Sequence, residues 1–266
     1  MNTAITELLD ICRRLIDPAA EPITVHAGHN GTAVLRATTA AGEVIVKRHR
    51  SPDRHRQELH AYQHWTPALG DRAPALLAVS DDPPAIVITA LPGRPLTTAI
   101  LGAAEETEAY RQAGELLRKL HLAGAPRMEP NMNAWLAERG EQWLALAKDI
   151  LSAERRAEIR AHLRELARLG PIPAVPCHLD YTPRNLLTTA TGRLTAIDFE
   201  HTRYDLAARD LVRLATRVWP THPDLQDAFL HGYQALTEED HQVIEHCSHL
   251  DALTAAVRAA GEQVSG

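Results

Sequence analysis

Apolar and polar residues alternate along this chain in two different ways, which divides it into a strand-rich first part and a helical remainder. In the first part, short apolar runs predict strands over residues 33–38 and 43–48, joined by a tight turn. Two further strands are predicted within residues 74–90, on either side of two consecutive prolines. Apolar residues at helical spacing predict an amphipathic helix over residues 5–16 and a second helix over residues 53–65.

After the segment LPGRPL, residues 91–96, apolar residues recur three and four positions apart, as is typical of helices. Long helices are predicted at residues 105–122, 133–151 and 153–169. A short pair of strands around a turn at Thr191-Gly192 interrupts this pattern, which becomes helical again after residue 206. The sequence therefore predicts a small strand-rich lobe over residues 1–91 and a larger helical lobe over residues 92–266.

Composition narrows the class of protein. The 266 residues are 45% hydrophobic and 23% charged, which is typical of a globular chain and long enough for two lobes. The formal net charge of -6 argues against a nucleic-acid binder, which needs a basic face, and is compatible with a cationic small molecule as partner.

Neither a membrane protein nor a secreted one is expected. No apolar run approaches the roughly 20 residues that span a bilayer. The first residues lack the charged start and small-residue cleavage site of a signal peptide. Three cysteines without motif spacing do not indicate a disulfide framework, so we expect a cytoplasmic protein.

The loop CHLDYTPRNLL, residues 177–187, gathers polar side chains beside a predicted hairpin. Asp180 and Asn185 precede the hairpin and Asp198 follows its second strand, so the hairpin can bring their side chains together. Carboxylate and amide oxygens suit Mg²⁺, which takes substrate phosphates as further ligands. The other aspartate can then accept a hydroxyl proton, and these are the parts that phosphoryl transfer requires.

Phosphoryl transfer also requires groups that bind the nucleotide phosphates, and the first part of the chain supplies candidates. Lys47 ends a predicted strand and is expected to be exposed on one side; Glu58 follows on the next helix and can hold it. The loop AGHNGT, residues 27–32, contains Gly28 and Gly31 and can cover the phosphates.

The ordered combination of these residues resembles the aminoglycoside phosphotransferase family, the small-molecule branch of the protein-kinase-like fold. The resemblance spans residues 23–214, and its strongest element is H-x-D-x-x-x-x-N followed by I-D-F, at residues 178–185 and 197–199. It implies an α+β, two-lobed protein-kinase-like fold with a β-rich, nucleotide-binding N-lobe. The helical C-lobe would carry the catalytic loop and the acceptor site.

The resemblance also implies a role for each matching residue. Asp180 would be the catalytic aspartate that orients the acceptor hydroxyl and takes its proton. Asn185 and Asp198 would hold magnesium. Lys47, steadied by Glu58, would contact the α- and β-phosphates.

Further residues would support these. Gly28 and Gly31 would lie in the phosphate-covering loop, and the main chain near Thr89 and Leu91 would meet the nucleotide base. His178 and Asp210 would brace the loop, while Leu179 stands where many relatives have glycine and Thr89 where many have an acidic residue.

The leading hypothesis is an ATP- or GTP-dependent phosphotransferase that acts on a hydroxyl of a small molecule. The resemblance suggests an antibiotic, either an aminoglycoside or a basic peptide of the viomycin–capreomycin type, with resistance as the result. Relatives that phosphorylate choline or sugars keep a non-antibiotic metabolite open as the acceptor, and others phosphorylate macrolides. A catalytically silent nucleotide-binding pseudokinase is the alternative, and the oligomeric state is left open.

Histidines and cysteines raise other hypotheses. His60 and His64, like His246 and His249, have helical spacing but no third ligand nearby in the sequence, so we interpret both pairs as surface or interface residues rather than zinc ligands. Cys177 is interpreted as a packed thiol rather than a nucleophile.

Overall fold

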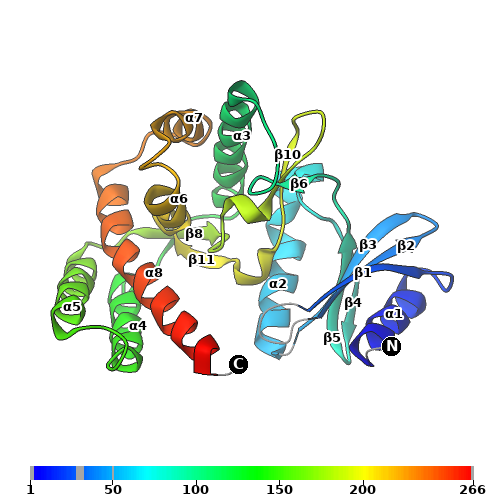
Figure 1. The fold of residues 1–266 in the computed structure, drawn as a ribbon, viewed down its shortest axis with the longest axis horizontal. Helices are drawn as coiled ribbons and strands as arrows, with labels where there is room; N and C mark the ends of the chain where they lie inside the picture. Colours follow the sequence, from blue (N-terminus) through cyan, green and yellow to red (C-terminus); the bar gives the residue numbers. More distant parts are fainter. Residues whose placement is uncertain (1–2, 28–32, 50, 265–266) are drawn as a thin grey trace. The chain divides into compact units, whose positions relative to one another are not determined.

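The computed structural model describes residues 3–27, 33–49 and 51–264, and the chain divides into two compact units. Unit 1 contains Met1–Glu105 and Pro183–Arg203, and unit 2 contains Glu106–Thr182 and Tyr204–Gly266. Unit 1 carries an antiparallel sheet and unit 2 is mainly helical (Figure 1), so the predicted α+β class is confirmed. The lobe boundary after residue 91 stays a prediction.

Unit 1 is built on a five-stranded antiparallel sheet with the strand order β1-β2-β3-β5-β4. Its strands are β1 (Glu21–Ala27), β2 (Ala33–Thr39), β3 (Gly42–Arg48), β4 (Leu76–Asp81) and β5 (Pro84–Thr89). The four predicted strands are confirmed. The apolar pattern did not predict β1, an edge strand in which Ile23 and Val25 are exposed rather than packed in the core.

The two faces of this sheet receive different helices. Helix α1 (Thr3–Leu15) packs on one face, where Leu8 and Cys12 join Val44 and Val46 in a buried apolar cluster (Figure 1). Side chains alternate between the faces of a strand, so Lys47 points to the opposite face from Val46. Helix α2 (Pro52–His64) supplies Glu58, one of the contacts of Lys47 on that face.

The segment LPGRPL pairs with the hairpin that carries the predicted metal ligands. Its strand β6 (Arg94–Pro95) joins β9 (Leu186–Thr188) and β10 (Leu194–Ala196) in a sheet of order β10-β9-β6. Gly93 has a φ of 124°, and a Cβ there would lie 2.8 Å from the Thr188 carbonyl oxygen, so this approach requires glycine. This pairing ties residues 183–203 to unit 1.

Unit 2 contains most of the helices and a three-stranded sheet of order β11-β8-β7. The helices are α3 (Ala103–His121), α4 (Met132–Leu146), α5 (Ala153–Arg168), α6 (Val212–Arg217), α7 (Pro223–Tyr233) and α8 (Glu238–Val264). The strands are β7 (Arg127–Met128), β8 (Pro173–Cys177) and β11 (Arg203–Leu206). The three predicted long helices are confirmed, while β8, which contains two prolines, was not predicted as a strand.

Helices α5 and α8 pack against each other through buried leucines, including Leu163 and Leu253. Helix α8 begins with a reciprocal cap: the Asp240 N–H donates to the Thr237 hydroxyl (3.1 Å), and the Asp240 carboxylate accepts from the Thr237 N–H (2.9 Å). The cap fixes where this 27-residue helix starts.

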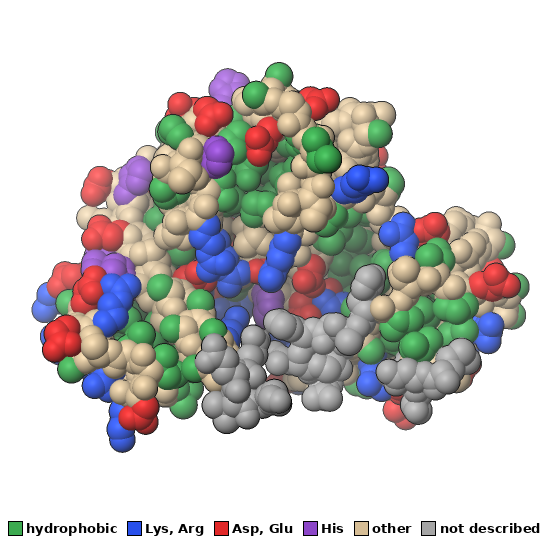
Figure 2. Space-filling model, viewed as in Figure 1, with side chains coloured by type: hydrophobic (Ala, Val, Ile, Leu, Met, Phe, Trp, Pro, Cys, Tyr) green, Lys and Arg blue, Asp and Glu red, His purple; other side chains and the backbone are tan. Residues whose placement is uncertain are grey.

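Surface charge, helix hydrophobicity and the state of the cysteines complete the description of the fold. Acidic and basic side chains are interspersed on the face drawn in Figure 2. Within the described residues, no helix combines the length and the apolar character that crossing a bilayer would require. All three cysteines are buried and free.

Candidate active site

Lys47 lies at the centre of a buried ionic cluster in unit 1. Its Nζ is 3.0 Å from Glu58 Oε2 on α2, 2.8 Å from Asp198 Oδ1 and 2.9 Å from Glu200 Oε2. Only 6% of Lys47 is exposed, so the expectation of a half-exposed lysine at the strand end is wrong. Helix α2 covers this face of β3 together with residues 198–200, which are far from β3 in the sequence.

Three carboxylates surround the ammonium group of Lys47. Burial by itself lowers the pKa of Lys47, but the carboxylates of Glu58, Asp198 and Glu200 outweigh it and hold this pKa well above its ordinary value. Lys47 therefore stays charged.

His49 supports Glu58 from the same strand end. Its Nε2 lies 2.5 Å from Glu58 Oε2, and both side chains are buried. The His49 N–H donates to the Pro84 carbonyl (3.0 Å), which holds the residue against β5. Sequence reasoning missed His49, although its position two residues after Lys47 places it on the same face of the extended chain.

Asn185 and Asp198 lie at adjacent ends of the β9–β10 hairpin, as predicted. The Ile197 N–H donates to the Asn185 carbonyl (3.0 Å), which brings the residues flanking both strands together. Asn185 is buried, whereas the Asp198 side chain is 40% exposed and Asp198 has a left-handed backbone with φ 65°. A carboxylate and an amide oxygen form a donor set that fits Mg²⁺.

Asp180 lies in unit 2, where an arginine holds it. Its Oδ1 accepts from Arg213 Nη1, and Arg213 Nε donates to Asp251 Oδ1 on α8 (3.0 Å). Burial lowers the pKa of Arg213, but Asp251 and Asp180 outweigh this effect and raise it. Arg213 and Asp251 were missed; Arg213 stands three residues after the predicted Asp210, which was the available signal.

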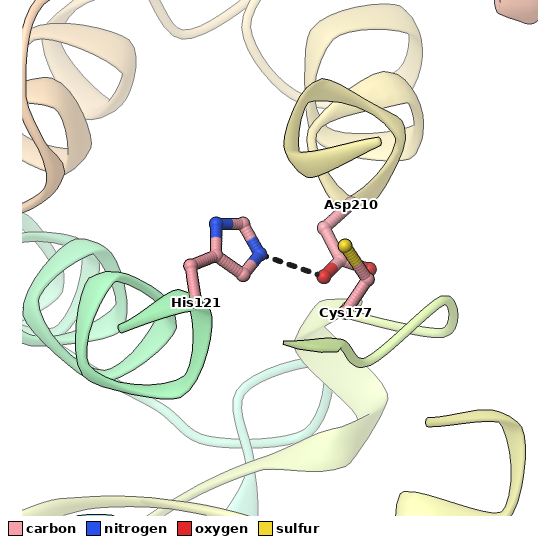
Figure 3. A group of neighbouring side chains, drawn as sticks. All are labelled: His121, Cys177 and Asp210. Carbon is pink, nitrogen blue, oxygen red and sulfur yellow. Dashed lines mark hydrogen bonds and ion pairs between the residues drawn. The ribbon is translucent and has the colours of Figure 1, made fainter. Parts of the chain in front are cut away.

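Asp210 braces the backbone of the loop that carries Asp180. It accepts the N–H groups of His178 (2.7 Å) and Leu179 (2.5 Å). His121 Nε2 lies 3.0 Å from the same carboxylate, and Figure 3 shows His121 on α3 pointing toward Asp210. Three polar contacts to one buried carboxylate leave the loop little freedom to move.

The loop backbone is strained at one residue. Leu179 has a φ of 60°, in the left-handed region that favours glycine. The preceding residue, His178, is fully buried. Its Nδ1 accepts the Asp180 N–H (3.3 Å), and its ring packs edge-on against the Tyr181 ring, with the ring centroids 5.6 Å apart. These contacts hold the left-handed turn that presents Asp180.

Cys177 is a packed thiol, as interpreted from the sequence. It is fully buried, its Sγ donates to the Asp205 carbonyl (3.3 Å), and burial raises its pKa well above the ordinary value. Figure 3 shows it beside Asp210 and His121. Because the Asp210 carboxylate already accepts loop N–H groups, we assign this group of three side chains to loop support rather than to a metal.

The remaining predicted nucleotide contacts divide into two groups. The Thr89 N–H at the end of β5 donates to the Ala75 carbonyl (3.0 Å), so it is already engaged within the sheet. Leu91 follows immediately, at the start of the LPGRPL segment. Gly28 and Gly31 lie outside the described residues.

Comparison with known proteins relates this chain to phosphate-transferring enzymes. The model of the phosphotransferase enzyme family, APH, matches residues 22–246. No curated protein matches the sequence. Among solved structures, an aminoglycoside-3'-phosphotransferase of type VIII is 21% identical, with 95% of this chain and 100% of that chain covered and a TM-score of 0.65.

Two other solved structures are similar. Choline kinase LicA from Streptococcus pneumoniae is 18% identical, with 96% of this chain and 92% of that chain covered and a TM-score of 0.67. The AMP-bound complex of spectinomycin phosphotransferase APH(9)-Ia is 16% identical, with 97% and 89% covered and a TM-score of 0.68. These likenesses confirm the predicted kinase-like fold. The family match spans most of the sequence, and the chain therefore belongs to the APH phosphotransferase enzyme family.

Proposed function

We propose that this phosphotransferase moves the γ-phosphate of ATP or GTP to a hydroxyl of a small molecule, with Asp180 as the catalytic aspartate. The observation that carries the proposal is the buried cluster around Lys47 in unit 1. A permanently charged ammonium beside Asp198 is suited to position phosphates and the cation that accompanies them.

Lys47 would contact the α- and β-phosphates of the nucleotide, and Glu58 would steady it. The short contact of Glu58 with His49 supports this role, because it fixes the carboxylate from its other side. Since the Thr89 N–H is engaged, the base would meet the Thr89 carbonyl or the main chain of Leu91. The glycine loop at residues 27–32 would cover the phosphates.

Asn185 and Asp198 would hold Mg²⁺. Their oxygen donors and the partial exposure of Asp198 fit a hard divalent cation. When bound, the ion would neutralise negative charge on the phosphates during transfer.

Asp180 would orient the acceptor hydroxyl and take its proton as the new oxygen–phosphorus bond forms and the bond to the β-phosphate oxygen breaks. Its ion pair with Arg213 supports this role, because a carboxylate held by a fixed arginine presents its oxygens in one orientation. His178 and Asp210 would keep the loop in place through the bonds described above.

We propose an antibiotic as the acceptor, either an aminoglycoside or a basic peptide of the viomycin–capreomycin type, phosphorylated in the cytoplasm with resistance as the result. Two of the similar structures are phosphotransferases of antibiotics, an aminoglycoside and spectinomycin, and the negative net charge suits a cationic acceptor. The similarity to choline kinase makes a choline-like metabolite the second candidate.

Asp198→Ala tests this proposal. We expect near-complete loss of phosphate transfer at every magnesium concentration, measured as nucleoside diphosphate release with a panel of aminoglycosides, basic peptides, choline and sugars. Asp149→Ala, at an exposed position, is the matched control and should retain activity. Activity of Asp198→Ala within about tenfold of the parent would refute the metal assignment. Resistance of expressing cells to the antibiotics of this panel identifies an antibiotic acceptor.

A further inference from the structure

Three histidines and two glutamates of unit 2 converge where α5 contacts α8. Figure 2 shows histidine side chains reaching the surface in this region, at the left of the view. The members of this histidine cluster are Glu158 and His162 on α5, and Glu245, His246 and His249 on α8.

His162 is the centre of the cluster. Its Nδ1 lies 3.1 Å from His246 Nδ1 and 3.9 Å from Glu245 Oε1. Its ring stacks on His249, with centroids 3.6 Å apart and planes 13° apart. The ligand atoms of His162, Glu245 and His246 all lie within 4.8 Å of one another, and so do those of Glu158, His162 and His249.

Packing on both sides holds the two helices together around this cluster. Leu163 and Leu253 are buried in one apolar cluster, and Leu166 and Val243 are buried in another. The backbone positions that carry the histidines are therefore fixed by the helix contact and not by the histidines themselves. A ligand at this position would meet a preformed arrangement, which lowers the ordering cost of binding.

The distances suit a metal ion. Zinc binds histidine nitrogen at about 2.0–2.1 Å in a tetrahedral arrangement, which places two ligand nitrogens about 3.3 Å apart. The separation of 3.1 Å between His162 and His246 is close to that value. A simple hydrogen bond between the two rings explains this one contact, but it does not explain why the Glu245 carboxylate also lies within reach of both histidine nitrogens.

The carboxylates beside the histidines also favour a cation. Glu245 is 62% exposed and can turn toward an ion at little cost. Glu158 is paired with Arg155 at 2.6 Å, which makes it the weaker carboxylate candidate.

We propose that His162, Glu245 and His246 bind a divalent transition-metal ion of the zinc class, with water as a fourth ligand and His249 as a positioning residue stacked on His162. The ion would join α5 to α8 in unit 2. It would be distinct from magnesium at the proposed phosphate site, because imidazole nitrogens select borderline metals over hard ones.

Zinc binding to the full-length protein tests the proposal. After treatment with EDTA and removal of the chelator, calorimetric titration with Zn²⁺ should show saturable binding of one equivalent, whereas Mg²⁺ should produce no comparable signal. Saturating zinc should raise the Tm by several degrees, because it binds only the folded chain. Absence of saturable binding would overturn the proposal.

Variants identify the ligands. His162→Gln and His246→Gln should each lower zinc affinity at least about tenfold, which is the smallest loss seen even for outer-shell partners of metal sites. Glu245→Gln, at an exposed position, should also weaken binding and covers the case in which a histidine variant fails to fold. His241→Gln, an exposed histidine on the same helix, is the matched control and should bind as the parent does.

Two results would contradict this assignment. Unchanged affinity in His162→Gln would exclude the cluster, and loss of binding in His60→Gln would assign the zinc to α2 instead. Asp198→Ala should bind zinc normally, which separates this inference from the proposed function.

Discussion

At the scale of single residues, Arg213 bears directly on the proposed catalytic role of Asp180, because it holds that carboxylate in place. Arg213 contacts both Asp180 and Asp251, so the proposed catalytic carboxylate does not stand alone. A carboxylate fixed in this way can be tested by removing its charge while its size is kept.

Asp180→Asn should lower kcat by about 10²–10⁴, the usual contribution of a general base, because the amide cannot accept the hydroxyl proton. Nucleotide affinity should change little, since Lys47 and Asp198 are untouched. Product formation gives kcat, and titration with nucleotide gives the affinity. Asp251→Asn, which disturbs Arg213 but keeps the Asp180 charge, should lower kcat less; full kcat in Asp180→Asn would show that this is not the catalytic loop.

The left-handed backbone of Leu179 gives a second residue-scale prediction. Left-handed geometry costs a non-glycine residue about 1–2 kcal/mol, whereas glycine adopts it freely. Leu179→Gly should therefore be more stable than Leu179→Ala, by up to about 1 kcal/mol, although glycine usually destabilises relative to alanine. Denaturant unfolding of both variants measures the difference. An alanine variant more stable than the glycine variant would contradict the strain.

At the scale of elements, the cluster around Lys47 joins β3 to Glu58 of α2 and to Asp198 and Glu200 in the turn after β10. Elements that are joined by a buried charge depend on it for stability as well as for ligand binding. Removing one member of such a cluster leaves the other charges without compensation.

Lys47→Ala should raise the KM for nucleotide, lower kcat and destabilise the fold. The loss of stability should be about 3 kcal/mol, at the low end of the range for breaking a buried pair, because Asp198 is 40% exposed to solvent. Steady-state kinetics and denaturant unfolding measure the two effects. Lys148→Ala, at an exposed position, is the control, and wild-type stability of Lys47→Ala would contradict the buried cluster.

The contact of α5 with α8 should be sensitive to acid when no metal is present. The folded protein holds the pKa of His246 and His249 below the ordinary 6.5, mainly through burial, so the unfolded chain binds more protons. The free energy of unfolding should therefore be fully retained above pH 6.5 and fall as the pH drops below it. Unfolding in EDTA from pH 5 to 8 measures this, and His246→Gln/His249→Gln should flatten the dependence; an unchanged slope would contradict it.

At the scale of the whole molecule, net charge links the chain to its acceptor. The formal charge of -6 would attract a polycationic acceptor, and salt screens such attraction over about 10 Å at 0.1 M. We expect the KM for the acceptor to rise between low and high salt, while the KM for nucleotide changes less. Steady-state kinetics over a salt series measures both, and an acceptor KM that stays constant would favour a neutral acceptor.

The sequence by itself determined the features that depend on neighbours along the chain. Alternating apolar residues specified β2 and β3, helical spacing specified α3 and α5, and the ordered motif from Lys47 to Asp198 indicated the phosphotransferase family. The closeness of Asn185 and Asp198 could also be predicted, because a short hairpin brings the residues that flank its two strands together.

Tertiary structure alone decided the features whose partners are far apart in sequence. Lys47 was expected to be exposed, but Asp198, 151 positions away, covers it. His246 had no third ligand nearby in the chain, yet the packing of α5 on α8 brings His162 to it from 84 positions away. Periodicity specifies which face of an element is buried, but not which element covers that face, and so the charged contacts across such faces are set only when the chain folds.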